Sequence, residues 1–475
     1  MQVKFIVTIK KRGFKLKRSG ALLLIFTFFL NLYSVDFDPD ESYCRFQKGH
    51  FAGFSILPVH EGRNTLLELS LFGTFTFDSF AFGVHAPIRF LLSNKDGVDT
   101  TGKVFPKDDW NEARDWVKLL KFFQYGHKHD LFYFYFGEHR NRYMGNGTIL
   151  GAYHNTLKLN FPKRGVNIGV NTDYAGIDFF MDDVTPPNVI GGRTYFKPLS
   201  FFDKQSYWNN LELGFTFLGD VFTPYRIVSE LYDSVPRRTV DEIYTYVAGF
   251  DIGFRFFTSE YYQVKFYTDW NKIKDAGSGF HLGLKHVADL PTIIPMRILS
   301  TWEYKAMQSN YAPSYFNTFY DIQREHYRDG MTKTRFLSDP SRKGSGWNHG
   351  YYFDLVYDIT GLFSIGGSFG HNRIYSNDLN SKFNNIEINA FINTILFKRI
   401  GADFTITFED INEGALKDEP FYRLSVYYLL SDFATLGFST RSAWYLRYRG
   451  EGVNFESYYK NTAFYSFGFY GTLRF

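Results

Sequence analysis

The sequence predicts an all-β protein, a single antiparallel transmembrane β-barrel of about 18 strands, within a range of about 16 to 20. Three observations lead to this class. Aromatic residues make up 20% of the 475-residue chain although 21% of it is charged, and the mean hydropathy is slightly negative. Strand-like stretches alternate apolar with polar residues, and short connections alternate with long ones. A lipid-facing outer surface around a wet lumen requires this combination.

The final stretch, 461–475, carries the alternation most clearly. Every second residue is apolar or aromatic, including Tyr465, Phe467 and Phe469, and the intervening row is mostly small or polar. A period of two places these rows on opposite faces of one strand. The terminal Phe475 resembles the signal read by the barrel-assembly machinery, so we expect that machinery and outer-membrane lipid as partners. For this stretch alone, an edge strand on a soluble core is the alternative.

The first 34 residues have the character of an export signal. A basic region without acids precedes the apolar run Gly20–Tyr33, which is too short to span a membrane comfortably. Seven of the 53 Lys and Arg residues lie there and none of the 49 acids, so the mature chain carries 46 − 49, or −3. That balance argues against a nucleic-acid partner. The single cysteine, Cys44, excludes an intramolecular disulfide.

The domain organisation follows from where the alternation begins. Residues 1–34 are expected to form the signal peptide, 35–64 a periplasmic or lumenal segment, and 65–475 the barrel. Within the barrel, 107–123 has apolar residues at helical spacing and is expected to form one short amphipathic helix. Such a helix is suited to cap or plug the barrel, or alternatively to dock a partner or act as a gate.

The remaining stretches read as strands joined by connections of two kinds. Expected strands are 65–75, 77–92, 131–138, 148–161, 165–173, 176–182, 190–198, 209–218, 242–256, 259–270, 277–288, 296–307, 350–358, 362–372, 385–395, 399–408, 420–430, 433–447 and 461–475. A barrel with both ends in the periplasm needs an even number of strands, so one of these nineteen is an error, which the irregular rhythm places within 131–207. Removing it leads to the count of 18.

Long connections are expected at 219–241, 308–349, 373–384, 409–419 and 448–460, and short ones at 258, 360–361, 397–398 and 431–432. Short periplasmic turns and long outer loops are typical of outer-membrane barrels. A two-sheet sandwich has no reason to place every long loop at one end. The final strand is expected to close the barrel by pairing with the first strand near Thr65. The long 308–349 loop can fold inward as a constriction or outward as a binding surface.

Polar side chains within 137–155, and one on the strand 399–408, are the candidate lumen or solute contacts. They are Glu138, His139, Arg140, Arg142, Asn146, His154, Asn155 and Asp403. His139 or His154 has the chemistry of a general base, but no G-x-S-x-G elbow accompanies either. We therefore assign no catalytic, metal or cofactor residues.

The stretch from Trp110 to Leu199 resembles a little-characterised group of bacterial outer-membrane barrel proteins. The motif residues are Asp109, Trp110, Glu112, Asp115 and Trp116, then Tyr125, Gly126 and His127, then Gly145, Gly147, Thr148, Ile149, Tyr153 and Asn155. The chain departs from the pattern at Asn146, where the group favours His. The resemblance implies a barrel fold in the bacterial outer membrane and no assigned reaction.

These features support three functional hypotheses. The first is a porin-like channel that passes small polar or charged solutes. The second is a surface interaction or adhesion protein that uses loops 219–241 and 308–349 on a barrel anchor. The third is a lipid-modifying enzyme of the outer membrane that uses His139 or His154. The residues are compatible with a monomer and with a trimer.

Overall fold

The computed structural model describes residues 50–474 except for the stretches 62–63, 96–99, 102–103, 107–108, 111–112, 159–162, 202–206, 233–234, 260, 291–294, 343–345, 360–361, 377–378, 393–398, 412–418, 432 and 452–453. The expected signal peptide, Cys44 and Phe475 lie outside the described residues.

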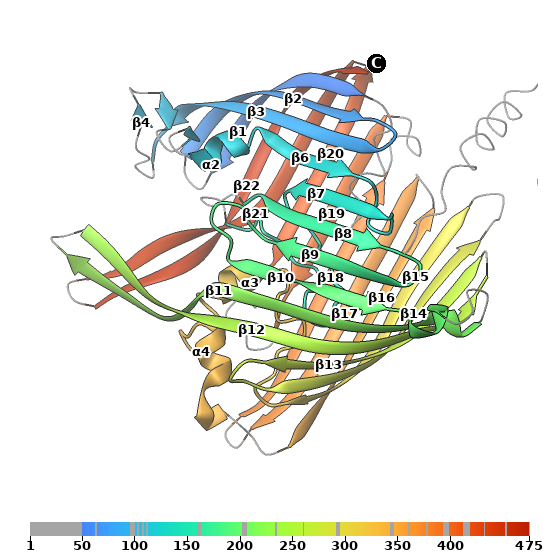
Figure 1. Ribbon diagram of the computed structural model, residues 1–475. Coiled ribbons are helices and arrows are strands. Elements are labelled where there is room, and N and C mark those ends of the chain that lie inside the picture. The colour runs from blue at the N-terminus through green and yellow to red at the C-terminus, as the bar shows by residue number, and fades with distance from the viewer. Residues whose placement is uncertain are drawn as a thin grey trace, which may run out of the picture. The chain divides into compact units, whose positions relative to one another are not determined.

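Twenty strands form one sheet that closes on itself (Figure 1). In chain order they are β1 Phe51–Glu61, β2 Asn64–Thr76, β3 Phe80–Ser93, β6 Leu120–Tyr125, β7 Phe132–Gly137, β8 Gly165–Asn171, β9 Ala175–Met181, β10 Val189–Phe196, β11 Leu211–Tyr232, β12 Val235–Thr258, β13 Tyr262–Ile273, β14 Ser278–Leu290, β15 Met296–Gln308, β16 Trp347–Ile359, β17 Phe363–Ser376, β18 Leu379–Ile392, β19 Ile400–Phe408, β20 Phe421–Ser431, β21 Ala434–Glu451 and β22 Asn454–Arg474. Each strand pairs antiparallel with its neighbours, which confirms the all-β antiparallel barrel.

The ring closes through β1 and β22, where Phe51 lies opposite Arg474 and Ile56 opposite Phe469. The prediction that the final strand pairs with the strand near Thr65 is therefore wrong. That strand is β2, and β1 lies between β2 and β22. The count of 18 is also too low. Strands β1 and β6 were not predicted from the sequence, and the described part of 148–161, residues 148–158, forms only isolated bridges rather than a strand.

The helix expected over 107–123 is much shorter in the structure. Helix α2 covers only Ala113–Val117, and the apolar positions after it belong to β6, which pairs with β3 and β7. The described chain has a few other short elements. They are β4 Thr100–Thr101, β5 Phe105–Pro106, η3 Pro198–Phe201, η4 Tyr207–Asn210, α3 Tyr320–Gln323, α4 Lys333–Ser338 and η5 Pro340–Arg342. No helix among the described residues is long and apolar enough to cross a membrane.

Side chains alternate between the two faces of the wall, as the period of a strand requires. On β13, Trp270 is 50% exposed and faces outward, whereas Asp269 and Asn271 on either side of it are buried inside the barrel. On β15, Trp302 is exposed next to the buried Thr301. The barrel thus has an apolar outside and a polar inside, the reverse of a soluble β-sandwich.

We call the end where β1 begins and β22 finishes the turn end, and the opposite end the loop end. Strands β6 to β10 are only 6–8 residues long, whereas β11 and β12 have 22 and 24 residues. The polar connection expected at 219–241 is therefore a hairpin whose two strands extend past their neighbours (Figure 1). The β21–β22 hairpin extends in the same way, and Ser229 of β11 pairs with Phe455 of β22.

The closure between β1 and β22 can be tested by cross-linking. In a Cys44→Ser background, we expect Ile56→Cys/Phe469→Cys to form a disulfide, because register partners lie within about 4.5–5.5 Å between Cα atoms. The matched control is Leu69→Cys/Phe469→Cys, since Leu69 lies opposite Ile56 on the far side of β1. Mass spectrometry of non-reduced digests identifies the link. A link in the control but not in the first variant would contradict the register.

Candidate functional site

Two connections at the loop end turn inward and pack against each other. They are the described residues of 138–164, which we call the β7–β8 segment, and of 309–346, the β15–β16 segment; together we call them the plug. Phe316 N–H donates to the Ile149 carbonyl at 3.0 Å, and Gly151 N–H donates to the Phe316 carbonyl at 3.1 Å. Tyr320 and Ile322 are fully buried. The long loop expected at 308–349 therefore folds inward.

The plug contacts opposite sides of the ring. Its core joins Ile149 and Leu150 to Leu218 of β11, Val247 of β12 and Met307 of β15. A second cluster packs the plug against Trp444 of β21. Since β11 and β21 stand on opposite sides of the closed strand order, a plug that contacts both bridges the lumen.

A buried ion pair joins the plug to β11. Arg324 donates to both carboxylate oxygens of Asp220, at 2.9 and 3.0 Å, and Tyr320 Oη donates to the same carboxylate at 2.8 Å. The Asp220 side chain has no exposed surface, and that of Arg324 is 8% exposed. Removing one partner of such a pair leaves the other charged and buried, so each side chain depends strongly on the other.

A second polar cluster, centred on Lys163, ties the two plug segments to the end of β9. Lys163 Nζ donates to Asp182 Oδ2 at 2.6 Å and to Asp321 Oδ1 at 2.7 Å. Tyr153 Oη lies 3.3 and 3.4 Å from the same two carboxylates. Burial favours the neutral amine, but the charges of Asp182 and Asp321 outweigh it and raise the pKa of Lys163 above its ordinary value. Lys163 therefore stays charged between the two carboxylates.

A third polar cluster is centred on Glu325 and includes one residue from each long hairpin. Its carboxylate accepts hydrogen bonds from Lys158 at 2.7 Å, from Arg238 of β12, and from Tyr459 of β22 at 2.8 Å. Burial opposes ionisation, but Lys158 and Arg238 dominate and lower the pKa of Glu325 to about 2. One carboxylate of the plug thus holds two hairpins that rise from opposite sides of the ring.

Three of the sequence-predicted site residues are structural supports of the β7–β8 segment. His139 N–H donates to Asn155 Oδ1 at 2.8 Å, and Asn155 Nδ2 donates to the Asp182 carbonyl at 2.8 Å. Arg142 is buried and lies 4.1 Å above the Tyr135 ring. These contacts shape the segment and leave little surface for a solute.

Neither histidine is suited to act as a general base. Burial, with a smaller contribution from Arg142, lowers the pKa of His139 to about 3, and its side chain is fully buried. Burial and the charge of Arg140 lower the pKa of His154 to about 3. A general base is most efficient when its pKa lies near the pH at which the enzyme works. A pKa of about 3 is far below neutral pH.

Three other predicted residues keep partial exposure. Glu138 and Arg140 pair at 2.5 Å with side chains 21% and 22% exposed. Asp403 pairs with Arg423 at 3.1 Å across β19 and β20. Asn146, by contrast, anchors the plug by donating to Asp269 of β13 at 2.9 Å. The predicted set therefore divides between plug supports and ion pairs within reach of solvent.

Several residues that hold the plug are not among the site residues predicted from the sequence. They are Lys158, Lys163, Asp182, Asp220, Arg238, Asp321, Glu325 and Tyr459. One signal was present: the 308–349 stretch carries Tyr311, Tyr315, Phe316, Phe319 and Ile322. An exposed outer loop has no need of such a density of large apolar side chains.

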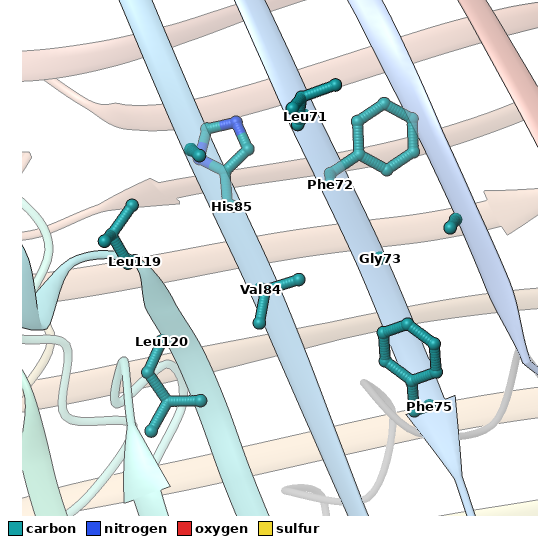
Figure 2. Close-up of a pocket in the computed structure, with 10 residues that line it drawn as sticks. Leu71, Phe72, Gly73, Phe75, Val84, His85, Leu119 and Leu120 are labelled. Carbon is teal, nitrogen blue, oxygen red and sulfur yellow. The ribbon is translucent and has the colours of Figure 1, made fainter.

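A separate apolar cavity of about 440 Å³ lies over β1 to β3 and the start of β6 (Figure 2). Leu71, Val84, Leu119 and Leu120 line it, and Gly73 and Ala86 leave room between them. Leu71 and Val84 are exposed on the outer face of the wall, so this cavity is not part of the plug. Among the described residues, no group of three His, Cys, Asp or Glu side chains is placed to hold a metal ion.

No family model matches the chain, and no curated protein matches it. The resemblance to a little-characterised barrel group therefore stays a prediction. Among solved structures, OpdL of Pseudomonas aeruginosa aligns at 10% identity and TM-score 0.33 over 90% of this chain and 98% of that one. Wzi of Escherichia coli, titled an outer membrane protein involved in group 1 capsule assembly and a carbohydrate binding β-barrel, aligns at 10% identity and TM-score 0.34 over 97% of this chain and 90% of that one. OpdK of P. aeruginosa with vanillate aligns at 8% identity and TM-score 0.34, covering 90% and 98%. Such TM-scores carry no argument, and the architecture rests on the strand pairing of this chain.

Breaking the Asp220–Arg324 pair should loosen the plug. For Arg324→Met we expect the docking of the β15–β16 segment to weaken by about 3–5 kcal/mol, because Asp220 is left buried without its cation. Limited subtilisin digestion should then cut the β15–β16 segment much faster than in the wild type. The matched control is Arg335→Met, since Arg335 is exposed. Equal protection of the segment in all three proteins would contradict the role of the pair.

Docking of the plug should also depend on pH through Lys333. This side chain is 1% exposed, and its Nζ donates to the Tyr315 carbonyl at 2.8 Å and to Gln323 Oε1 at 2.6 Å. Burial lowers the pKa of Lys333 from 10.5 to about 8, and the charge of Glu409 opposes the shift. An undocked segment therefore binds more protons between pH 8 and 10, so docking should strengthen as the pH rises through that window.

The gain should reach up to about 3 kcal/mol. We expect resistance to subtilisin in the β15–β16 segment to increase from pH 8 to pH 10 in the wild type. Lys333→Met should remove most of this dependence, and the Arg335→Met control should retain it. A dependence unchanged in Lys333→Met would exclude Lys333 as its source.

Proposed function

We propose that the chain is an outer-membrane channel for small polar or charged solutes, with passage controlled by the plug. The observation that carries the proposal is the contrast within the lumen. Lys265, Lys285, Asp354 and Glu387, which face inward nearer the turn end, keep partial exposure, whereas Lys163, Asp321 and Arg324, which hold the plug, are buried. Water therefore reaches the inner wall up to the level of the plug.

The outer surface supports a membrane location. Large apolar side chains are exposed on strands all around the ring, including Leu71, Phe215, Trp302, Ile365 and Phe467. Soluble monomers rarely expose contiguous apolar patches larger than a few hundred Å². A belt of this kind around a closed sheet is the outer surface of a transmembrane barrel.

The way the plug is attached supports a gating role. Both segments are covalently continuous with the wall, so they can move only by leaving their polar contacts. Those contacts include ion pairs such as Lys163–Asp182 and Arg324–Asp220. Separating both partners of a buried pair together costs little net free energy, because each ion regains its hydration. A plug held in this way can open without unfolding the barrel.

A surface interaction protein remains the second candidate function, with one of its two proposed loops no longer at the surface. The 308–349 loop that it needs is packed inside the barrel. The β11–β12 and β21–β22 hairpins continue past the neighbouring strands (Figure 1), and they offer the surface that a partner would contact. This candidate predicts partner binding that survives changes to the lumen and is lost when the hairpins are shortened.

Planar-bilayer recording tests the channel proposal. We expect wild-type protein with heat-modifiable, folded mobility to give discrete conductance steps. Arg324→Met should open more often or to larger steps, because its plug is held less firmly, and Arg335→Met should behave as the wild type. Folded wild type and folded Arg324→Met that both lack conductance would overturn the proposal.

A further inference from the structure

A line of inward charges crosses the wall on the turn-end side of the plug. Arg255 of β12 lies opposite Lys265 of β13, and Lys265 lies opposite Lys285 of β14. The same line continues through Thr301 of β15 to Asp354 of β16. It then passes through Ser368 of β17 to Glu387 of β18. We call this line, from Arg255 to Glu387, the charged row.

The charged members of the row face the lumen and keep contact with solvent. Their neighbours along each strand point outward, as the exposure of Phe256, Phe266, Leu355 and Ile388 indicates. Arg255, Lys265, Lys285, Asp354 and Glu387 are all partly exposed. A solute in this part of the lumen can therefore approach them.

The row separates charge by sign. Three cations occupy its β12–β14 part, a hydroxyl group follows at Thr301, and two carboxylates occupy the β16–β18 part. Glu212 approaches Lys265 at 3.8 Å, but that carboxylate also accepts from Arg193 at the shorter distance of 2.8 Å. Lys285 and Asp354 stand two strands apart, which at about 4.8 Å per strand is roughly 10 Å.

The arrangement does not serve the stability of the sheet. Like charges directly opposite each other on neighbouring strands are destabilising, and the row places Arg255 opposite Lys265 and Lys265 opposite Lys285. Alternating signs would have been more favourable for the wall. Attraction between cross-strand neighbours therefore does not account for the order of charges in the row.

The row lies directly before the plug. Lys285 Nζ is 3.3 Å from the Asn146 carbonyl of the β7–β8 segment. On β13, Asp269, which holds that segment through Asn146 and Thr148, follows Lys265 on the same face toward the loop end. A solute that moves through the lumen therefore passes the row on one side of the gate.

Resting on the channel function proposed above, we propose that the charged row selects small zwitterionic solutes. A carboxylate of the solute lies along Arg255, Lys265 and Lys285, and an ammonium group lies along Asp354 and Glu387. A solute with a single sign is attracted by one part of the row and repelled by the other, whereas a zwitterion can satisfy both. Short peptides, whose terminal charges are several ångströms apart, have the chemistry that the row recognises.

Liposome-swelling rates with defined probes test this proposal. The probes are triglycine, its N-acetyl form as an anion, its amide as a cation, and arabinose as a neutral solute. We expect wild-type channels to favour triglycine over both singly charged forms. The preference should be about fivefold, the factor given by roughly 1 kcal/mol of attraction between unit charges about 4 Å apart in water.

Two double variants change one part of the row at a time. Lys265→Gln/Lys285→Gln should lose the triglycine preference and favour the cationic amide, and Asp354→Asn/Glu387→Gln should favour the anionic N-acetyl form. The matched control is Asp289→Asn/Arg297→Gln, which removes an ion pair outside the row without changing the net charge. That control should keep the wild-type order.

The outcomes separate the two proposals. If arabinose permeates but both row variants keep the wild-type order of probes, the row does not select and this inference is wrong while the channel stands. If no probe permeates through folded wild type or folded Arg324→Met, the channel proposal itself fails. A switch of preference in opposite directions in the two row variants supports the inference.

Discussion

The closure of the strand ring is the constraint on which the rest of the structure depends. Once β22 pairs with β1, every strand has two partners and the sheet has no free edge. A ring of 20 strands encloses a lumen too wide for wall side chains alone to fill. The chain fills it with two of its own connections. Because those connections carry backbone polar groups into the interior, they need partners there, and the inward rows of the wall provide them.

Much of the fold could be predicted from local pattern because a strand between lipid and water shows its two faces in sequence. The strands from β13 onward carry that alternation and are found close to where it predicts them. The failures have physical causes. Pro58 and Gly53 obscure the alternation of β1, and the apolar residues of β6 continue the spacing of α2, so both strands were overlooked. Residues 148–161 alternate as a strand would, yet their described part, 148–158, packs into the plug.

The site was far less predictable, because its contacts join distant parts of the chain. Lys163 meets Asp321 across 158 residues, and Arg324 meets Asp220 across 104. No local period records such pairs. The predicted residues of 137–155 lie in the β7–β8 segment of the plug, where glycines and polar side chains accompany irregular backbone. Their positions differ: His139 and Asn155 brace the segment, whereas Glu138 and Arg140 pair with each other and keep partial exposure.

The composition of the plug contacts bears on whether the lumen is permanently closed. Four carboxylates, Asp182, Asp220, Asp321 and Glu325, meet four cations, Lys158, Lys163, Arg238 and Arg324. Such a balanced cluster is costly to break one residue at a time, yet its net contribution to stability is small, because each ion regains its hydration when all separate together. The apolar clusters around Ile149 and Trp444 hold the plug as well. In the gating role proposed above, the balanced charges lower the free-energy cost of releasing the plug when water enters the lumen.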